Sequence, residues 1–319
     1  MRGLIDAWFS PKLARCLPDI SDYMNISSRR SRDNPFVTAK RAVSLPPRLV
    51  FGLCAAACLW LAPQAASAQG RMDAQYEATL AGIPVGKGAW TIEIGDDTFS
   101  ASAQGGTAGL LKAFSGGTGS GASQGRVVGG ALVANAYTAT TTTQKKSETI
   151  RLVLANGNVK DFSIAPAPPV DPDRVVVTDA HRKGVFDPMT GSMLRVPGNG
   201  EVLSPDFCRT GAGIFDGRLR YDLKLDYKRM ETVKAERGYH GPALVCAIYF
   251  TPVAGYIPDR PVIKYLATER RIEIAFVPIA GTRVLVPFRM TIPTPFGPAM
   301  LEATSFVTTA APPRVAKTN

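Results

Sequence analysis

Alternation of apolar and polar residues with a period of two is the feature that most limits what this chain can fold into. It runs through residues 221–228 (YDLKLDYK), 90–94 (WTIEI) and 271–276 (RIEIAF). Successive side chains of a β-strand point to opposite faces, so each segment predicts a strand with one buried and one solvated face. One-sided burial of this kind is typical of antiparallel sheets.

Further segments favour strands over helices. Residues 149–164 hold two runs of β-forming residues separated by Asn156-Gly157, a pair that accepts the positive φ angles of a type I′ hairpin turn. Residues 137–143 (YTATTTT) are rich in β-branched threonine, and residues 243–250 (ALVCAIYF) predict a strand buried on both faces. Long amphipathic helical patterns are absent. The chain is therefore predicted to be all-β, an antiparallel curved sheet or barrel-like domain with one or two short helices.

Three connecting stretches complete the predicted organisation. Residues 115–125 are rich in Gly and Ser and are expected to form a mobile loop. Residues 165–173 (APAPPVDPD) predict a proline-stiffened crossover that could separate two lobes. We expect a single β-rich domain over residues 69–309 and a disordered tail over residues 310–319.

The N-terminal region, residues 1–68, carries the pattern of a signal peptide. Residues 49–62 are uncharged and apolar or small, basic residues precede them, and Ala66 and Ala68 have the A-x-A spacing of a cleavage site. We expect cleavage after Ala68 and export to the periplasm. No stable transmembrane span is expected after cleavage, since a span needs about 20 apolar residues. The apolar run could instead be a buried helix or an uncleaved anchor, and the true start codon could lie downstream of Met1.

Charge and cysteine usage agree with export. The leader holds nine of the 37 Lys and Arg and four of the 26 Asp and Glu, so the remainder has a net charge near +6, which predicts only weak attraction to anionic surfaces. No nucleic-acid partner is expected because of the export signal. Of five cysteines, only Cys208 and Cys246 follow the leader. In an oxidising compartment this pair predicts a disulfide that stabilises by about 4 kcal/mol. Two separate buried thiols are the alternative.

Residues 181–191 (HRKGVFDPMTG) hold one of the chain's two histidines and are the first place to look for a site. Asp187 followed by Pro188 predicts a helix N-cap with room for about two helical turns behind it. His181 could act as a base with Ser192 and Asp187, but no G-x-S-x-G elbow supports this arrangement. We expect a junction that shapes the domain, with His181 and Arg182 facing a binding surface.

The candidate ligand-facing residues share a polar or aromatic side chain within two stretches, the one just described and the FDGR turn that begins the 221–228 strand. They are His181, Arg182, Asp187, Asp216, Arg218 and Tyr221. No catalytic residue is assigned. No metal or cofactor is expected, because the two histidines are far apart and neither an H-E-x-x-H motif nor a Walker-type phosphate loop is present.

Short segments in a fixed order resemble a known family. They include YEATLAGIPVGKGAW, HRKGVFDPMTGSML, CRTGAGIFDGRLRYDLKL and VPFRMTIPTPFGPAMLEATSF. Together they resemble, over residues 76–306, the domain of unknown function 3108 family of bacterial exported proteins. The resemblance implies an exported, β-rich domain of the cell envelope, with Cys208 and Cys246 at the positions of the family's pair. It implies no known catalytic residues.

The sequence therefore favours a non-catalytic periplasmic module that binds a cell-envelope component, either a lipid or a polysaccharide. One alternative is a scaffold or assembly partner that pairs with another envelope protein through an exposed strand edge. Another is an envelope hydrolase that uses His181 with Asp187 or Asp216. A concave inward face is required for the binding hypothesis, because a curved sheet that is packed solid has no room for a ligand.

Overall fold

The structure is a computed structural model that describes residues 69–109 and 116–310. The predicted leader, residues 1–68, and the tail from residue 311 lie outside the described residues. In the described part, seven strands come first: β1 (Gly70–Leu80), β2 (Ile83–Ile94), β3 (Thr98–Thr107), β4 (Gly117–Val128), β5 (Ala131–Thr143), β6 (Ser147–Ala155) and β7 (Asn158–Ala165). Each strand pairs antiparallel with the next, so this half is a meander.

The second half begins with short elements and ends with long strands. Its described helices are the 3-10 helices η2 (Asp179–Arg182), η3 (Thr190–Ser192) and η4 (Pro205–Arg209) and the α-helix α3 (Pro261–Thr268). Its strands are β8 (Leu194–Arg195), β9 (Gly211–Phe215), β10 (Arg220–Lys234), β11 (Arg237–Gly238), β12 (His240–Ala254), β13 (Glu273–Pro278), β14 (Val284–Ile292) and β15 (Ala299–Ala310).

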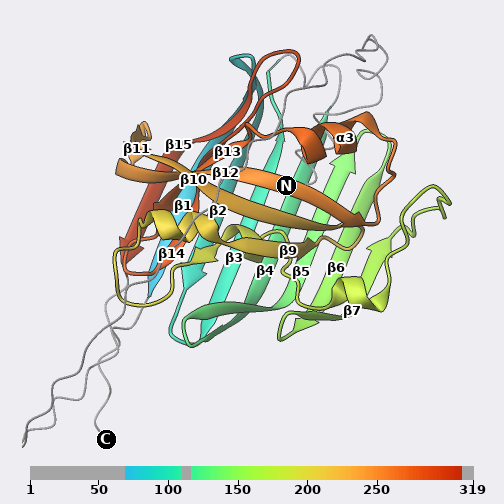
Figure 1. Cartoon of the computed structure of the whole chain (residues 1–319), viewed down its shortest axis with the longest axis horizontal. Coiled ribbons are helices and arrows are strands. Elements are labelled where there is room, and N and C mark those ends of the chain that lie inside the picture. Colours follow the sequence, from blue (N-terminus) through green and yellow to red (C-terminus); the bar gives the residue numbers. More distant parts are fainter. Residues whose placement is uncertain (1–68, 110–115, 311–319) are drawn as a thin grey trace, which may run out of the picture. The chain divides into compact units, whose positions relative to one another are not determined.

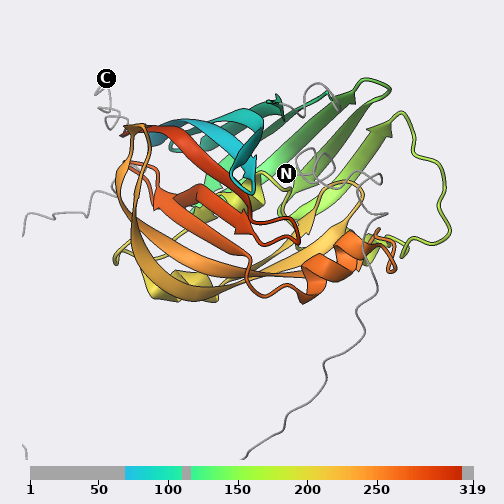
Figure 2. The same cartoon turned by 90° about the horizontal axis from the view of Figure 1, so that it is seen from above.

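The strands join into one 15-stranded sheet in the order β7-β6-β5-β4-β3-β2-β1-β15-β14-β13-β12-β10-β9, with β8 attached to β14 and β11 to β15. The sheet curls so that β10, β12 and β13 pass across the meander, as both views show (Figures 1 and 2). The first and last strands meet in its middle, where Gly70 is paired with Ala310. Strands β7 and β9 are its two ends, so the sheet is not closed. The predicted all-β class and curved antiparallel sheet are confirmed.

A short segment bridges the gap between the two ends of the sheet. Val185 N–H donates to Gly157 O in the β6–β7 turn at 2.8 Å. The next residue, Phe186, donates to Gly213 O at 2.8 Å and accepts from Phe215 N–H at 2.9 Å, both on β9. These bonds place residues 185–186 between the turn and β9. We call residues 185–186, together with the contacts of Arg218 with Glu148 and of Phe215 with Phe162 beside them, the seam.

The buried apolar residues of the described chain form two clusters. The first lies between the meander and the strands that cross it, and its fully buried members include Met72, Ile92, Phe288 and Phe306. The second lies on the opposite face of β10, β12, β13 and β14 and includes Phe207, Leu244, Phe276 and Leu285. Strand β12 contributes to both, so its predicted burial on two faces is confirmed for Ala243–Ile248.

The predicted mobile loop at residues 115–125 is wrong, because residues 117–128 form strand β4 between β3 and β5. Small residues suit this central position. A Cβ on Gly125 would overlap Val133 O of β5 and the ring of Phe99 of β3, so the close approach of these neighbouring strands requires glycine there. Composition suggested flexibility, but pairing on both edges holds the strand in place.

Two other sequence expectations concern connections. The hairpin at Asn156-Gly157 is confirmed, since it joins β6 to β7 with φ angles of 50° and 72°. Residues 165–173 link β7 to the second half, and the strands on either side belong to the same sheet. The domain boundaries and the two-lobe alternative stay predictions.

Candidate functional site

An apolar cavity of about 400 Å³ lies against the face of the sheet that carries the second cluster. Its walls come mainly from β9, β10, β12, β13, β14, α3, η4 and the segment 186–195, and the start of β5 contributes Ala131 and Leu132. Side chains from most of these elements are aliphatic or aromatic, for example Leu223, Ile248, Phe250, Leu266, Ile274 and Ile292. The described structure therefore has room for a ligand on this face of the sheet, whereas the inward face between the meander and the crossing strands is packed by the first cluster.

The period-two pattern of β10 supplies one wall of the cavity. Tyr221, Leu223 and Leu225 line it, and Asp222 and Lys224 alternate with them on the other face of the strand. Tyr221 also packs on Phe250 of the paired strand β12, with ring centroids 5.4 Å apart. The alternation seen in the sequence thus becomes a continuous apolar surface on one side of a two-stranded ribbon.

Helix α3 supplies a second wall through its apolar face. Val262, Ile263 and Leu266 line the cavity, whereas Lys264 pairs with Asp259 at 3.0 Å on the exposed side. Pro261 occupies the first turn, where its missing N–H costs no intrahelical bond. With eight residues the helix is too short to be stable alone, so its packing against the sheet holds it.

Glu269 fixes the C-terminal end of α3. Its buried carboxylate accepts hydrogen bonds from the backbone N–H of Arg270 and Arg271 at 2.9 and 2.8 Å and from the Arg271 side chain at 2.9 and 3.0 Å. The hydroxyl of Tyr265 donates to the same carboxylate at 3.0 Å. The hydrogen bond with Arg271 is the main cause that lowers the pKa of Glu269 to about 2. The carboxylate therefore stays charged and keeps the helix end in place.

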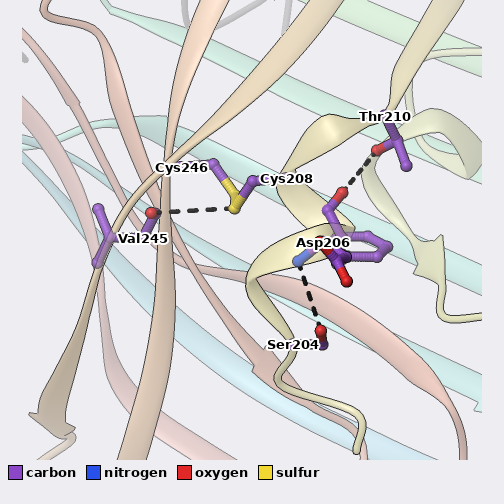
Figure 3. The surroundings of a disulfide bond; sticks show 7 residues. Ser204, Asp206, Cys208, Thr210, Val245 and Cys246 are labelled. Atoms are coloured by element: carbon purple, nitrogen blue, oxygen red, sulfur yellow. Dashed lines mark hydrogen bonds between the residues drawn. A yellow bond between two sulfur atoms is a disulfide. The ribbon is translucent and has the colours of Figure 1, made fainter. Parts of the chain in front are cut away.

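A disulfide anchors η4 over the same face of the sheet (Figure 3). Cys208 is bonded to Cys246 of β12, with Cα atoms 5.6 Å apart, and the predicted pairing is confirmed. Ser204 caps the helix by accepting from Asp206 N–H at 3.4 Å. Between these residues, Phe207 enters the cavity wall and makes an edge-on contact with Phe276, centroids 6.1 Å apart. The disulfide thus holds one side of the cavity against β12.

Asp216 and Tyr221 are the two predicted ligand-facing residues that line the cavity. The buried Asp216 carboxylate accepts hydrogen bonds from Arg218 N–H at 2.8 Å and Leu219 N–H at 2.7 Å. Gly217 has a φ of 96°, which confirms the turn expected at this position. Asp216 therefore shapes the β9–β10 turn at the cavity wall.

Arg218 lies outside the cavity wall and belongs to the seam. Its guanidinium forms an ion pair with Glu148 of β6, with Nε 3.1 Å from Oε1, and only 13% of the side chain is exposed. Beside it, the ring of Phe215 meets Phe162 of β7 edge-on at 6.0 Å between centroids. These contacts hold the β9–β10 turn against the far end of the meander.

His181 and Arg182 also lie outside the cavity wall. The Nδ1 atom of His181 accepts a hydrogen bond from Thr178 N–H at 3.1 Å, so the ring caps the start of η2. Arg182 lies over the ring of Phe162 at 4.5 Å and pairs with Asp179 at 3.2 Å. Arg182 therefore holds η2 beside β7, whereas His181 bonds within the start of η2. Whether either faces a ligand stays a prediction.

Asp187 is fully buried and organises the segment that follows it. Its Oδ1 accepts from the N–H groups of Met189 and Thr190, both at 3.0 Å, and its Oδ2 accepts from the Ser123 hydroxyl of β4 at 3.2 Å. Burial raises the pKa of this carboxyl, and the hydrogen bonds partly oppose that effect. Asp187 thus holds the turn that follows it, but it is not the N-cap that the sequence predicted, because η3 begins at Thr190 and its N-cap is Met189.

The prediction of about two helical turns after Asp187 is wrong. The structure has one 3-10 turn, η3, because the chain then extends into β8 and pairs with β14. Ser192 donates to Pro188 O at 2.8 Å, which closes the turn locally. A sheet partner far along the chain overrides the local helical signal.

Several wall residues were missed by sequence reasoning. Phe207, Arg195 and the α3 residues carry no distinctive motif, although Pro261 followed by apolar residues at helical spacing was a usable signal for α3. Among the described residues, no group of three or more His, Cys, Asp and Glu could hold a metal ion. No helix of residues 69–109 and 116–310 is long and apolar enough to cross a membrane.

The fold and the cavity define a class of protein, an open and strongly curled antiparallel sheet with an apolar cavity against one face. The chain matches the family described as "Protein of unknown function (DUF3108)" over residues 75–304, and it belongs to this family. The resemblance seen in the sequence is confirmed.

Other comparisons identify no function. Among curated proteins, none matches the chain. Among solved structures, the chain is similar to a "Beta-barrel-like Protein of Domain of Unknown Function DUF1849 from Brucella abortus". The identity is 8% and the TM-score 0.38, over 76% of this chain and 98% of that one.

Proposed function

We propose that this protein is an exported, non-catalytic module that binds a lipid of the cell envelope in the apolar cavity. The observation that carries the proposal is the cavity itself, about 400 Å³ bounded mainly by aliphatic and aromatic side chains. Small-molecule sites have volumes of about 300–1,000 Å³ and walls of this composition with few polar groups. The volume lies at the lower end of that range, which favours a small or single-chain molecule.

The composition of the wall favours a lipid over a polysaccharide. A sugar ring carries several hydroxyl groups, and burying a hydroxyl without a hydrogen-bond partner costs about 1–3 kcal/mol. The strands and α3 offer mainly side chains such as Ile248, Leu266 and Ile292, which cannot provide those partners. An acyl chain makes no such demand, and burying it gains about 0.8 kcal/mol per CH₂ group.

The hydrolase alternative has less support. It requires His181 at a cleft with a carboxylate beside it, whereas the ring is bonded to Thr178 and lies outside the wall of the described cavity. Asp187 bonds to its own turn and to Ser123. These contacts have structural explanations, so the observations favour binding.

Export to the periplasm is part of the proposal. The Cys208–Cys246 disulfide supports it, because disulfides persist in oxidising compartments. The signal-peptide pattern that ends at Ala68 supports the same location. In cells that express the full chain, we expect the periplasmic fraction to contain a protein whose first residue is Gln69. A full-length protein in the membrane fraction would favour the anchor alternative.

Binding can be tested with a matched pair of alanine substitutions. Ala212 of β9 lines the cavity, and Ala122 of β4 is exposed on the outer face of the meander. Protein from cells that express the full chain should carry a reproducible extra mass in native mass spectrometry that leaves on mild activation. Ala212→Phe should reduce both this mass and the binding of the apolar dye Nile red, because the added ring occupies the cavity. Ala122→Phe should leave both unchanged.

The outcomes separate the remaining hypotheses. Equal dye binding by the two variants would show that the dye does not enter the cavity. A protein that carries no extra mass and binds no apolar probe would contradict the proposal, and a stable envelope protein partner in crosslinked cells would then favour the scaffold.

A further inference from the structure

We propose that the cavity selects a single-chain amphiphile with an acidic headgroup, a carboxylate or a phosphate, whose negative charge pairs with Arg195. This inference rests on the proposed function and specifies the chemistry of its ligand. It is argued from the charged groups in the wall, from the surroundings of Arg195 and from the course of the cavity along β14.

The charged side chains in the cavity wall are mostly cationic. They are Arg174, Arg195, Arg260 and Asp216. The Asp216 carboxylate is engaged by the N–H groups of its own turn. Three guanidinium groups against one carboxylate favour an anionic ligand over a neutral or cationic one.

Two of the three arginines are poorly placed to select a ligand. Arg174 donates to Gly255 O at 2.7 Å and pairs with Asp171 at 3.4 Å, so much of its hydrogen-bonding capacity is used within the protein. Arg260 is exposed at the start of α3, where water screens its charge. The remaining guanidinium in the wall is that of Arg195, whose side chain is half-buried.

Arg195 is held in place by the strand pairing of β8 and by packing against Gly130. It belongs to β8, whose backbone pairs with Val284 of β14. Its guanidinium lies against Gly130 in the β4–β5 turn, so close that a Cβ there would overlap it. The φ of Gly130 is 77°, which also favours glycine. Within the described residues, the Arg195 guanidinium makes no ion pair or hydrogen bond, so it is positioned and available to bind an anion.

The cavity extends away from Arg195 along one strand. Arg195 is paired with Val284 at the start of β14, and Pro287, Met290 and Ile292 line the cavity further along it. From Val284 to Ile292 is eight residue steps, roughly 26 Å at about 3.3 Å per residue. The cavity wall therefore includes residues spread along β14 from near Arg195 to its far end. An acidic headgroup at Arg195 would therefore direct a single acyl chain along β14 toward α3.

The test compares three ligands that share one chain and differ in headgroup. Dodecanoate, dodecyl phosphate and dodecanol compete with Nile red for the purified protein at neutral pH. Wild-type protein should bind one or both acids at least about tenfold more tightly than the alcohol, the usual effect of a hydrogen-bonded charge pair. The two acids distinguish a fatty-acid type of ligand from a phosphate-bearing one.

Three variants locate the selectivity. Arg195→Met keeps an apolar stem against Gly130 and removes the charge, so it should lose the preference for acids while its affinity for dodecanol stays within about twofold of wild type. Arg260→Met should change the preference by less than about threefold. Arg126→Met, on the exposed surface of β4, is the matched control and should behave as wild type.

Each result has one meaning. Failure of all three ligands and of Nile red to bind the wild type would contradict the proposed function. Equal binding of acids and alcohol would leave cavity binding intact and overturn the acidic headgroup. A preference that survives in Arg195→Met and disappears in Arg260→Met would overturn the role of Arg195. If Arg195→Met does not fold, salt still tests the acidic headgroup in the wild type, since added salt should weaken binding of the acids and leave the alcohol unaffected. Loss of the preference in Arg260→Met would then overturn the role of Arg195.

Discussion

The two halves of the sheet use β-strands in different ways. Strands β1–β6 bury one face in the first cluster and expose the other, which is dominated by small polar side chains such as Gln104, Ser120 and Thr140. Strand β12 is instead buried on both faces over Ala243–Ile248. The meander removes its apolar side chains from water once other strands pack against its one apolar face. A strand that is apolar on both faces needs further elements packed against its second face as well.

That second cover explains where the cavity lies. It consists of α3, η4 and irregular segments, which are joined to the sheet by side-chain contacts and one disulfide rather than by a continuous strand ladder. A sheet packed on a sheet interdigitates closely, whereas short elements that approach from different directions leave space between them. The apolar cavity is on this side. On the outer face of the meander, the hollow of about 580 Å³ is open, and polar side chains such as Gln75, Lys87 and Thr142 line it together with several glycines.

The largest expected effect concerns the disulfide of the second half. Cys208→Ala combined with Cys246→Ala should lower the free energy of unfolding by about 4 kcal/mol, because the bridge closes a loop of 38 residues. Urea denaturation measures this loss. Hydrogen exchange should show that amides of η4 and β12 lose protection while those of β2 and β3 keep it. An equal loss of protection in both halves would contradict the difference between them, since it would mean that they unfold as one unit.

A smaller effect is expected from the carboxylate that fixes α3. The pKa of Glu269 is lowered from 4.5 to about 2, so its contribution is complete above about pH 4.5 and is lost as the pH falls toward 2. Glu269→Gln should therefore cost about 1–2 kcal/mol at neutral pH, less than the full pKa shift implies because Arg271 is largely exposed.

Urea denaturation of Glu269→Gln and of the wild type at several pH values provides the measurement. The difference between them should shrink toward zero near pH 2. Glu77→Gln in the meander is the control, because Glu77 pairs with the exposed Lys87 at 3.4 Å and should contribute less than about 0.5 kcal/mol. A cost for Glu269→Gln that does not change with pH would indicate lost packing rather than lost charge.

The smallest effect is expected on the outer face of the meander. Thr140 shares a hydrogen bond of 3.0 Å with Thr149 and has solvent beside it, so Thr140→Val should change the free energy of unfolding by less than about 0.5 kcal/mol. The reverse substitution, Val245→Thr on β12, places a hydroxyl in a fully buried position and should cost about 2 kcal/mol. Thermal or urea unfolding of the two variants and the wild type measures both changes in the free energy of unfolding. Similar costs at both positions would remove the distinction between the two halves.

Much of the fold could be predicted from the sequence because its signals are local. Alternation in residues 221–228, the Asn156-Gly157 turn and the continuous apolar run at 243–250 each specify structure within a few residues. The disulfide followed from there being only two cysteines after the leader. These predictions depend on neighbours along the chain, and the structure agrees with them.

The cavity and the seam could not be predicted in the same way. The guanidinium of Arg195 reaches the β4–β5 turn, and Asp187 is bonded to Ser123, a residue 64 positions away. Strand β4 was expected to be a loop because its glycines and serines carry no alternation of apolar residues, and only its two partner strands define it. Such positions are set by contacts between distant parts of the chain. Residue type alone does not specify them.

The pairing of β1 with β15 has a consequence for the order of folding. Gly70 and Ala310 are partners although roughly 240 residues separate them, so this ladder cannot begin until the last described strand, β15, is available to pair. Until then one edge of β1 has no native partner, while the other edge can already pair with β2. Closing so long a loop is entropically costly and slow compared with forming hairpins. The central ladder of the finished sheet is therefore among the last to form.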